Sequence, residues 1–277
     1  MKNKFIFLSA FILLLYSCAF QPITKSKNII YSTENKLALN IFSPKNITTP
    51  HDVFVFIHGG NWRTGHKSLY NFFGKRMARK GIVTVIIDYR LSPLTDYQGM
   101  AMDAAKAIKW TKENISSYGG DPDKLFVSGH SAGGHLAALI STDNHYFDEL
   151  KIKNPLKGTI LIDAFGLDMY SYLNSSENKW NKIYVPIFTA DPENWKAGSP
   201  IYHLNNKMPE FLLFTGSKTY PWIIRGSNDF LFALQKYQPE TQLISVKGRR
   251  HVGMIFSFFN PHKKAYGEII EFIKNVK

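Results

Sequence analysis

The residues best suited to nucleophilic catalysis are in the stretch 129–133, where a serine lies between two glycines. Gly129, Ser131 and Gly133 follow residues 124–127, which are typical of a buried strand, and precede the helix-forming run 136–140. A tight turn from a strand into a helix presents such a serine hydroxyl at its apex. The positions two before and two after it must lack side chains, because a Cβ there would collide with the neighbouring backbone. The pattern indicates a nucleophilic serine in a nucleophile elbow, and its alternative is a flexible glycine-serine turn.

A glycine pair, Gly59-Gly60, follows the apolar run that ends at Ile57. Glycines let backbone N–H groups approach a ligand closely, and such donors stabilise the negative oxygen of a tetrahedral intermediate in acyl transfer. We expect the N–H groups of Gly60, Asn61 and Ala132 to form this oxyanion hole. A plain glycine turn is the alternative, which the serine motif about 70 residues later disfavours.

With these stretches the chain resembles a known family, the α/β-hydrolases of the hormone-sensitive-lipase-like and kynurenine-formamidase-like esterases. The resemblance covers nearly the whole chain after the leader. It rests on His58-Gly59-Gly60-Asn61-Trp62, Asp88-Tyr89-Arg90-Leu91-Ser92-Pro93, Asp103 with Trp110, Gly119-Gly120-Asp121-Pro122, and Gly129 to Ala137. The resemblance implies hydrolysis of carboxylic esters or formamides without a cofactor. Bacterial members often act on acetylated or aryl-ester groups of plant polysaccharide or on xenobiotic esters.

The base of such a serine is expected late in the chain, because the order in this fold is serine, acid, histidine. His251 lies just beyond residues 243–246, which are typical of a last strand. It can accept the proton of Ser131 and return it to the leaving group. His135 is one helical turn after the serine and His130 is beside it, so both are weaker candidates.

The acid is missing from its expected place. The family places an aspartate after the penultimate strand, here 211–215, but the loop 216–221 has no carboxylate and Thr219 stands at that position. Asp168, beyond strand 159–162, is our first choice for a carboxylate from the neighbouring strand end, with a loop or capping role as its alternative. Asp229, on the helix after Pro221, is the second choice. Otherwise Thr219 or a water orients His251 in a weak or lapsed enzyme.

Strands and helices alternate along the chain. We expect a hairpin of 29–31 with 37–42, buried strands at 52–57 and 82–87, and helices at 69–79 and 96–116. This alternation predicts a single α/β-hydrolase domain over 29–277, with a mainly parallel sheet covered by helices on both faces.

A small cap insertion is expected over residues 169–200. This segment is rich in aromatic residues: Tyr170, Tyr172, Trp180, Tyr184 and Trp195. Their rings can line an acyl or aryl pocket, or form the small core of the cap itself. The natural substrate would be determined here, but neither it nor the mobility of the cap can be deduced from the pattern.

Residues 1–18 are typical of an export signal, with Lys2 and Lys4 before an apolar stretch too short to span a bilayer comfortably. The ending Leu15-Tyr16-Ser17-Cys18 resembles a bacterial lipobox, which predicts a lipid on Cys18; an ordinary secretory signal is the alternative. Residues 19–28 are polar and predict a tether. We therefore expect an exported bacterial protein held in the cell envelope by a lipid anchor, or else a periplasmic or secreted one. Cys18 is the only cysteine, so no intrachain disulfide is possible.

The chain is strongly basic, with 34 Lys and Arg against 21 Asp and Glu. A basic surface attracts anionic head groups or acidic polysaccharide, although scattered lysines more often form a solvated face. No zinc-ligand spacing, phosphate-binding glycine loop or nucleic-acid motif accompanies the charge, so we expect no metal, cofactor or nucleic-acid partner.

These patterns predict a serine hydrolase that cleaves a small-molecule carboxylic ester through an acyl-enzyme on Ser131. One alternative is an arylformamidase-like amidase, against which the export signal argues because such substrates are normally intracellular. Others are a non-catalytic binding protein that has lost the acid, and a basic surface-binding module. The oligomeric state leaves no trace in the sequence.

Overall fold

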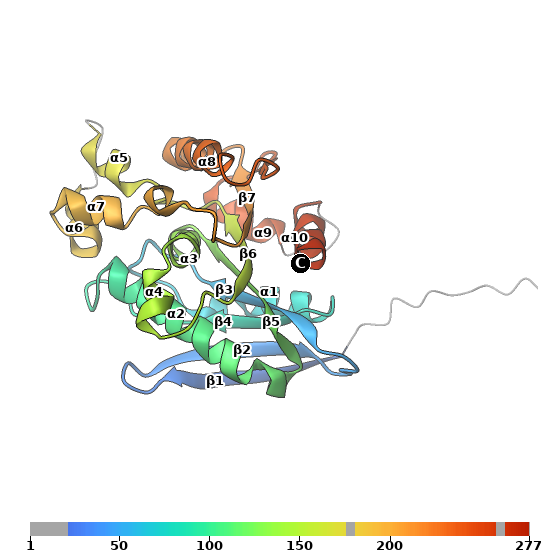
Figure 1. Cartoon of the computed structure of the whole chain (residues 1–277). Helices are drawn as coiled ribbons and strands as arrows, with labels where there is room; N and C mark the ends of the chain where they lie inside the picture. Colours follow the sequence, from blue (N-terminus) through green and yellow to red (C-terminus); the bar gives the residue numbers. More distant parts are fainter. Residues whose placement is uncertain (1–21, 176–180, 259–263, 277) are drawn as a thin grey trace, which may run out of the picture.

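The computed structural model describes residues 22–175, 181–258 and 264–276, arranged around one eight-stranded sheet (Figure 1). The strand order is β1-β2-β4-β3-β5-β6-β7-β8. The strands are β1 (Ile23–Ser32), β2 (Leu37–Pro44), β3 (His51–Ile57), β4 (Val83–Ile87), β5 (Gly120–His130), β6 (Leu156–Ile162), β7 (Glu210–Gly216) and β8 (Leu243–Val246). β2 is antiparallel to β1 and β4, while β3 to β8 run parallel, so their carboxyl ends meet at one edge.

Helices cover both faces of the sheet (Figure 1). They are α1 (Asn71–Ala78), α2 (Tyr97–Asn114), α3 (Ala132–Thr142), α4 (His145–Glu149), α5 (Met169–Asn174), α6 (Asn181–Phe188), α7 (Pro192–Ala197), α8 (Pro221–Leu234), α9 (His251–Ser257) and α10 (Lys264–Asn275). Short 3-10 helices are η1 (Lys67–Tyr70), η2 (Ile115–Tyr118) and η3 (Pro200–His203).

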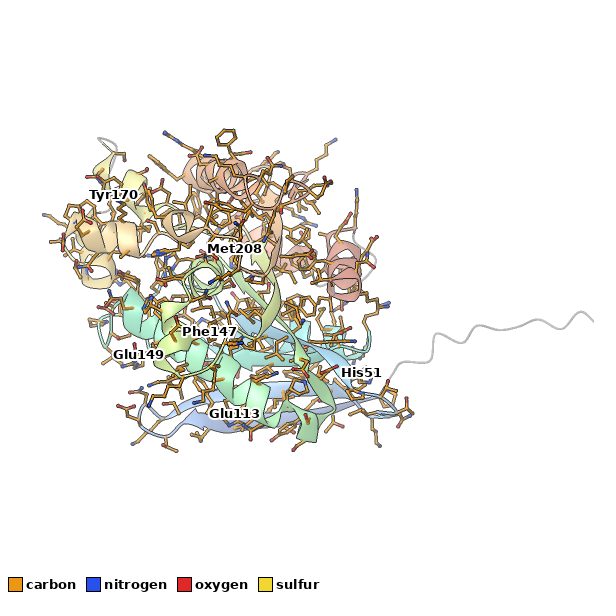
Figure 2. The ribbon with its side chains drawn as sticks, viewed as in Figure 1. His51, Glu113, Phe147, Glu149, Tyr170 and Met208 are labelled. Atoms are coloured by element: carbon orange, nitrogen blue, oxygen red, sulfur yellow. The ribbon has the colours of Figure 1, made fainter. Side chains whose placement is uncertain are left out.

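The side chains of β3 show how one strand serves two hydrophobic cores. Val53, Val55 and Ile57 join the core beneath α2 and α3, while Phe54 and Phe56 join the core beneath α1 and α10. Successive strand residues point to opposite faces, so a strand covered on both sides must be apolar throughout. Side chains fill both interlayer spaces (Figure 2). The predicted α/β-hydrolase architecture, with its mainly parallel sheet, is confirmed.

The hairpin begins earlier than expected. β1 starts at Ile23 and pairs with β2 from Ile23 opposite Pro44 onward, so the prediction of a tether over 19–28 is wrong for residues 23–28. Most side chains of residues 23–28 are exposed, so this part of the strand needs no apolar pattern, and lysines on an edge strand discourage pairing with another chain. Residues 1–21, with the predicted export signal and Cys18, lie outside the described residues. Among the described helices, none is both long and apolar enough to cross a membrane.

The range expected to form a cap contains three short helices, α5, α6 and α7, drawn in yellow and orange at one side of the molecule (Figure 1). Phe188 at the end of α6 stacks on Tyr97 of α2, with ring centroids 5.1 Å apart. Trp195 donates its indole N–H to the backbone oxygen of Thr189, 2.9 Å away. These contacts fasten the segment to the sheet domain and give it a small core of its own. Trp180 lies outside the described residues.

Candidate active site

Ser131 occupies the turn between β5 and α3 with φ 55° and ψ −123°. Non-glycine residues rarely adopt such a positive φ, and held there they store backbone strain. A Cβ on Gly129 would collide with the carbonyl of Gly133, and one on Gly133 would collide with the carbonyl of Ile57. The two glycines therefore permit the sharp turn, as the spacing in the sequence predicts.

His251, the first residue of α9, lies between Ser131 and a buried carboxylate. Its Nε2 is 2.9 Å from the Oγ of Ser131, and its Nδ1 is 2.6 Å from Oδ2 of Asp163. With the Nδ1 proton donated to Asp163, Nε2 is free to accept the serine proton. Three elements far apart in sequence thus form one continuous hydrogen-bonded relay.

Asp163 follows directly on β6, with a positive φ of 49°, and its side chain is fully buried. Oδ1 accepts the backbone N–H of Gly216 at 2.8 Å and the hydroxyl of Thr215 at 3.2 Å, and Oδ2 accepts the hydroxyl of Thr219 at 2.5 Å. Burial alone would raise the pKa of Asp163, but the hydrogen bonds from His251, Thr219 and Gly216 outweigh it and lower this pKa below its usual value. Asp163 is therefore an ionised partner for the imidazole.

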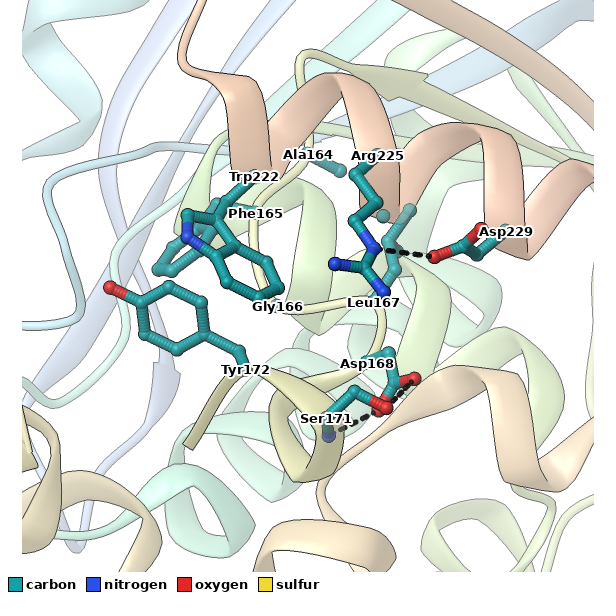
Figure 3. A pocket seen from close by; sticks show the side chains of 11 residues that line it. Ala164, Phe165, Gly166, Leu167, Asp168, Ser171, Tyr172, Trp222, Arg225 and Asp229 are labelled. Atoms are coloured by element: carbon teal, nitrogen blue, oxygen red, sulfur yellow. Dashed lines mark hydrogen bonds and ion pairs between the residues drawn. The ribbon is translucent and has the colours of Figure 1, made fainter. Parts of the chain in front are cut away.

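Neither of the two aspartates predicted from the sequence is the partner of His251, whose Nδ1 meets Asp163 instead. Figure 3 shows Asp168 beside Ser171 and Asp229 beside Arg225. Asp168 caps α5, accepting the N–H of Ser171 at 2.9 Å and its hydroxyl at 2.6 Å. Asp229 lies on the outer side of α8, where it pairs with Arg225 at 3.6 Å. The choice of Asp168, and of Asp229 second, is therefore wrong: the chain has already turned away into the cap by residue 168.

The prediction that the acid comes from the end of β6, the strand next to β7, is correct, but the carboxylate belongs to the first residue after that strand. Asp163 was not predicted because a second aspartate, Asp168, follows the same strand and was preferred. Thr219 does stand in the loop after β7, as expected, but it donates to Asp163 rather than orienting His251 directly. The useful signal was a lone carboxylate at the carboxyl end of a buried parallel strand.

The loop expected to form the oxyanion hole is a tight turn after β3. Gly60 has φ 132° and Asn61 has φ 53°, and the carbonyl of Gly60 accepts the N–H of Thr64 at 2.9 Å. Within the described part of the chain, no acceptor satisfies the N–H of Gly60, Asn61 or Ala132. Ala132 is the first residue of α3, whose initial N–H groups have no partner within the helix. These donors are thus available to a ligand oxygen.

A buried ion pair supports this loop. The ammonium of Lys67 is 2.6 Å from Oδ2 of Asp88, and Lys67 also donates its backbone N–H to Oδ1 at 2.7 Å. Next to Asp88, the hydroxyl of Tyr89 donates to the carbonyl of His58 at 3.0 Å, and the two rings stack with centroids 4.5 Å apart. The motif after β4 therefore fixes the backbone that precedes Gly59.

Replacing Lys67 by methionine should lower the free energy of unfolding by about 3 kcal/mol, because it leaves Asp88 largely buried without its cation. The Lys67 side chain is only 4% exposed and that of Asp88 18% exposed. Lys106→Met is the matched control, since Lys106 meets Glu34 at 3.8 Å near the surface and its loss should cost less than about 1 kcal/mol. Urea denaturation of both variants measures the difference; equal losses would contradict this role of the pair.

Two further histidines are structural. The ring of His130 lies against that of His251, with centroids 4.7 Å apart, and its Nε2 donates to the backbone oxygen of His251 at 3.2 Å. His135 bridges the core and the cap: its Nε2 donates to the carbonyl of Gly198 at 2.7 Å, and its Nδ1 accepts the indole N–H of Trp62 at 3.3 Å. Burial lowers the pKa of His135 to about 4 and, with the charge of His251, that of His130 to about 3. Both side chains are neutral at pH 7.

The free energy of unfolding should fall as the pH is lowered from about 6.5 to about 4. In this window His130 and His135 become protonated in the unfolded chain but not in the native protein. Their contribution to stability is therefore fully present above pH 6.5, the ordinary pKa of histidine, and is lost progressively below it. His135 alone accounts for about 3 kcal/mol of this loss.

Urea denaturation at several pH values, for the parent and for His135→Gln, measures this pH dependence. The variant should show a shallower decline between pH 6.5 and pH 4. The loss that comes from protonating Asp163, whose pKa is lowered, belongs to more acidic pH, below its ordinary value of 3.8. Equal slopes for the two proteins would contradict a buried neutral His135.

The relay opens into a cavity of about 1010 Å³. Its wall includes Gly59, Gly60, Asn61, Ser131 and His251, and its remaining lining is mainly apolar and aromatic. The cap contributes Tyr172, Ile183 and Tyr184. The expected aromatic residues thus divide between two roles: Tyr172 and Tyr184 face the cavity, while Trp195 belongs to the cap core. None of the described residues that line the cavity is Asp, Glu, Lys or Arg, so the cavity suits an uncharged ligand.

Donor atoms of His130, Asp163 and His251 lie within 4.8 Å of one another, a spacing that a metal site would also require. Both ring nitrogens of His251 are already engaged, by Ser131 and by Asp163. The proton relay accounts for the grouping without a metal.

The BD-FAE family model matches residues 39–230. The chain is 26% identical over 265 residues to the isoprenylcysteine alpha-carbonyl methylesterase ICME of Arabidopsis thaliana, covering 90% of this chain and 61% of that protein. It is 26% identical over 240 residues to esterase LipC of Mycobacterium tuberculosis, covering 83% of this chain and 57% of that protein. The chain spans about 60% of the length of the first curated relatives that it matches.

Solved structures show the same fold. A truncated carbohydrate esterase from gut microbiota superposes with a TM-score of 0.77 at 21% identity, over 92% of this chain and 96% of that one. Esterase B from Lactobacillus rhamnosis superposes with a TM-score of 0.74 at 18% identity, over 92% of this chain and 85% of that one. Both similarities identify the architecture of esterases with an α/β-hydrolase fold.

Proposed function

This chain belongs to the BD-FAE family, and on that basis we propose that it hydrolyses carboxylic esters through an acyl-enzyme formed on Ser131. The observation that carries the proposal is the relay from Asp163 through His251 to Ser131, with distances of 2.6 and 2.9 Å. The serine faces a large uncharged cavity beside three available backbone donors. Esterases among the relatives and structural neighbours support the same reaction class.

In the proposed reaction, the Oγ of Ser131 attacks the ester carbonyl while His251 Nε2 takes its proton. The N–H groups of Gly60, Asn61 and Ala132 stabilise the oxyanion that develops, and Asp163 stabilises the imidazolium. His251 then protonates the departing alkoxide. A water molecule deprotonated by the same imidazole attacks the acyl-enzyme, which releases the carboxylic acid and restores Ser131.

The alternative of a non-catalytic binding protein is disfavoured, because Asp163 supplies a carboxylate to His251. That alternative depended on a missing acid, and a buried ionised carboxylate lies at the Nδ1 of His251. No contact in the described structure singles out a formamide over an ester.

Hydrolysis of p-nitrophenyl acetate and butyrate, beside hydrolysis of formanilide, tests the reaction class. The parent should turn over both esters and should be much slower on the aryl formamide. Turnover of formanilide that exceeds that of both esters would support the amidase instead, and an absence of all three activities in a folded parent would contradict the proposed hydrolysis.

We also propose, from the sequence of residues 1–18, that Cys18 carries a lipid anchor in the bacterial cell envelope. Support comes from the charged and apolar parts of this leader and from its lipobox-like end. Bacteria that express the full chain can be fed an alkynyl fatty acid. The parent should be labelled and Cys18→Ser should not; an unlabelled parent would favour ordinary secretion.

A further inference from the structure

Apolar side chains surround the mouth of the active-site cavity. Leu69, Tyr220, Val252 and Phe256, which we call the rim, all line the cavity and are 66%, 63%, 64% and 54% exposed. Large apolar side chains are normally buried, and an exposed group around a cavity is typical of an interaction surface.

The rim residues come from three segments, two of which are hydrogen-bonded to each other. Leu69 lies on η1, Tyr220 directly precedes α8, and Val252 and Phe256 are one turn apart on α9. The loops before α8 and α9 are joined by the N–H of Lys218 to the carbonyl of Arg249 at 2.9 Å. The ring of Tyr220 also meets that of His251, with centroids 5.3 Å apart. The rim is therefore built on fixed backbone close to the nucleophile.

Basic residues flank the rim and acidic ones are missing from its segments. Residues 53–87, 211–228 and 241–267 contain no Asp or Glu. Exposed cations lie beside the cavity-lining residues: Arg63, Lys218, Lys247 and Arg250. Among the described residues, none of these four forms an ion pair. The mouth thus combines an apolar ring with uncompensated positive charge.

We propose that the rim docks on an anionic lipid surface, so that the active-site mouth faces the bilayer. Apolar side chains of this kind enter the boundary between head groups and acyl chains, while neighbouring Lys and Arg attract anionic head groups. An acidic polysaccharide would satisfy the positive charge but offers no apolar phase to cover the rim. Docking itself does not require ester hydrolysis.

The single cysteine of the chain allows a local test. In the full chain with Cys18→Ser, Val252→Cys or Phe232→Cys provides one labelling position for an environment-sensitive fluorophore. Phe232 is the matched control, since it is 73% exposed but lies about three turns along α8 from Tyr220 and does not line the cavity. The vesicles contain phosphatidylglycerol and phosphatidylcholine in equal parts, with a lipid-borne doxyl quencher.

The label at position 252 should be quenched by these vesicles and the label at 232 should not. This difference is expected even if the leader, residues 1–18, also binds the membrane. Lys218→Glu with Arg250→Glu should weaken the apparent vesicle affinity by about tenfold or more, whereas the matched pair Lys153→Glu with Lys157→Glu should not. Ester hydrolysis by the parent is measured separately without vesicles, so failure of docking and failure of the proposed hydrolysis are distinguishable.

Equal quenching at both positions, or none at either, would overturn the proposal. A response at 252 to soluble polygalacturonate but not to vesicles would assign the surface to an acidic polysaccharide instead. A response that depends on protein concentration without vesicles would show that a second copy of the chain covers the rim.

Discussion

Replacing Asp163 by asparagine should lower kcat for p-nitrophenyl butyrate by about 10⁴-fold. An amide cannot hold the Nδ1 proton of His251 as a carboxylate does, and it cannot stabilise the imidazolium that forms when Ser131 gives up its proton. The side chain is nearly unchanged in shape, so Gly216, Thr215 and Thr219 keep a partner in the same place. Steady-state kinetics, with circular dichroism to verify folding, measure the effect.

Asp168→Asn and Asp229→Asn are the matched controls for this substitution. Each removes a negative charge close to the cap or α8, but neither carboxylate approaches the imidazole. Both variants should keep kcat within a few-fold of the parent. If either one loses as much activity as Asp163→Asn, the acid has been assigned to the wrong strand end.

Replacing Ser131 by alanine should abolish turnover, with a loss in kcat of about 10⁶-fold. The effect is larger than for the acid because no covalent intermediate can form, while the base and the backbone donors remain. p-Nitrophenyl butyrate hydrolysis measured beside buffer alone sets the limit of detection. Activity in a folded Ser131→Ala protein within tenfold of the parent would mean that another group carries the reaction.

The nucleophile, the base and most strands could be predicted because their signals are local. Gly129 and Gly133 leave room for one kind of turn, and β8 has the bounds 243–246 that were predicted for the last strand. His251 follows that strand within a few residues, although it begins a helix rather than lying in a loop. Where a feature depends on a few adjacent residues, sequence spacing carries enough information.

The acid was predicted at the correct strand end but on the wrong residue, because Asp163 and Asp168 both follow β6 and only the folded turn brings Asp163 to His251. Asp163 and His251 are 88 residues apart, and the parallel pairing of β6, β7 and β8 brings the carboxyl ends of these strands together. A carboxylate at the end of β6 can serve the same imidazole as one after β7, so no acid is needed in the loop after β7. Thr219 in that loop donates its hydroxyl to Asp163.

The first part of β1 was missed for a different reason. Residues 23–28 contain two lysines, a serine and an asparagine, a composition that is as typical of a tether as of an edge strand. Only pairing with β2, from Ile23 opposite Pro44 to Ser26 opposite Ile41, distinguishes the two. Backbone hydrogen bonding of this kind leaves little mark on side-chain composition.

Labelling with a fluorophosphonate, followed by intact mass and peptide mapping, tests most directly whether the relay activates Ser131. The parent should gain one phosphonyl group per chain, on Ser131, and Asp163→Asn should react far more slowly. A folded parent that remains unlabelled, or one labelled on another residue, would contradict the account.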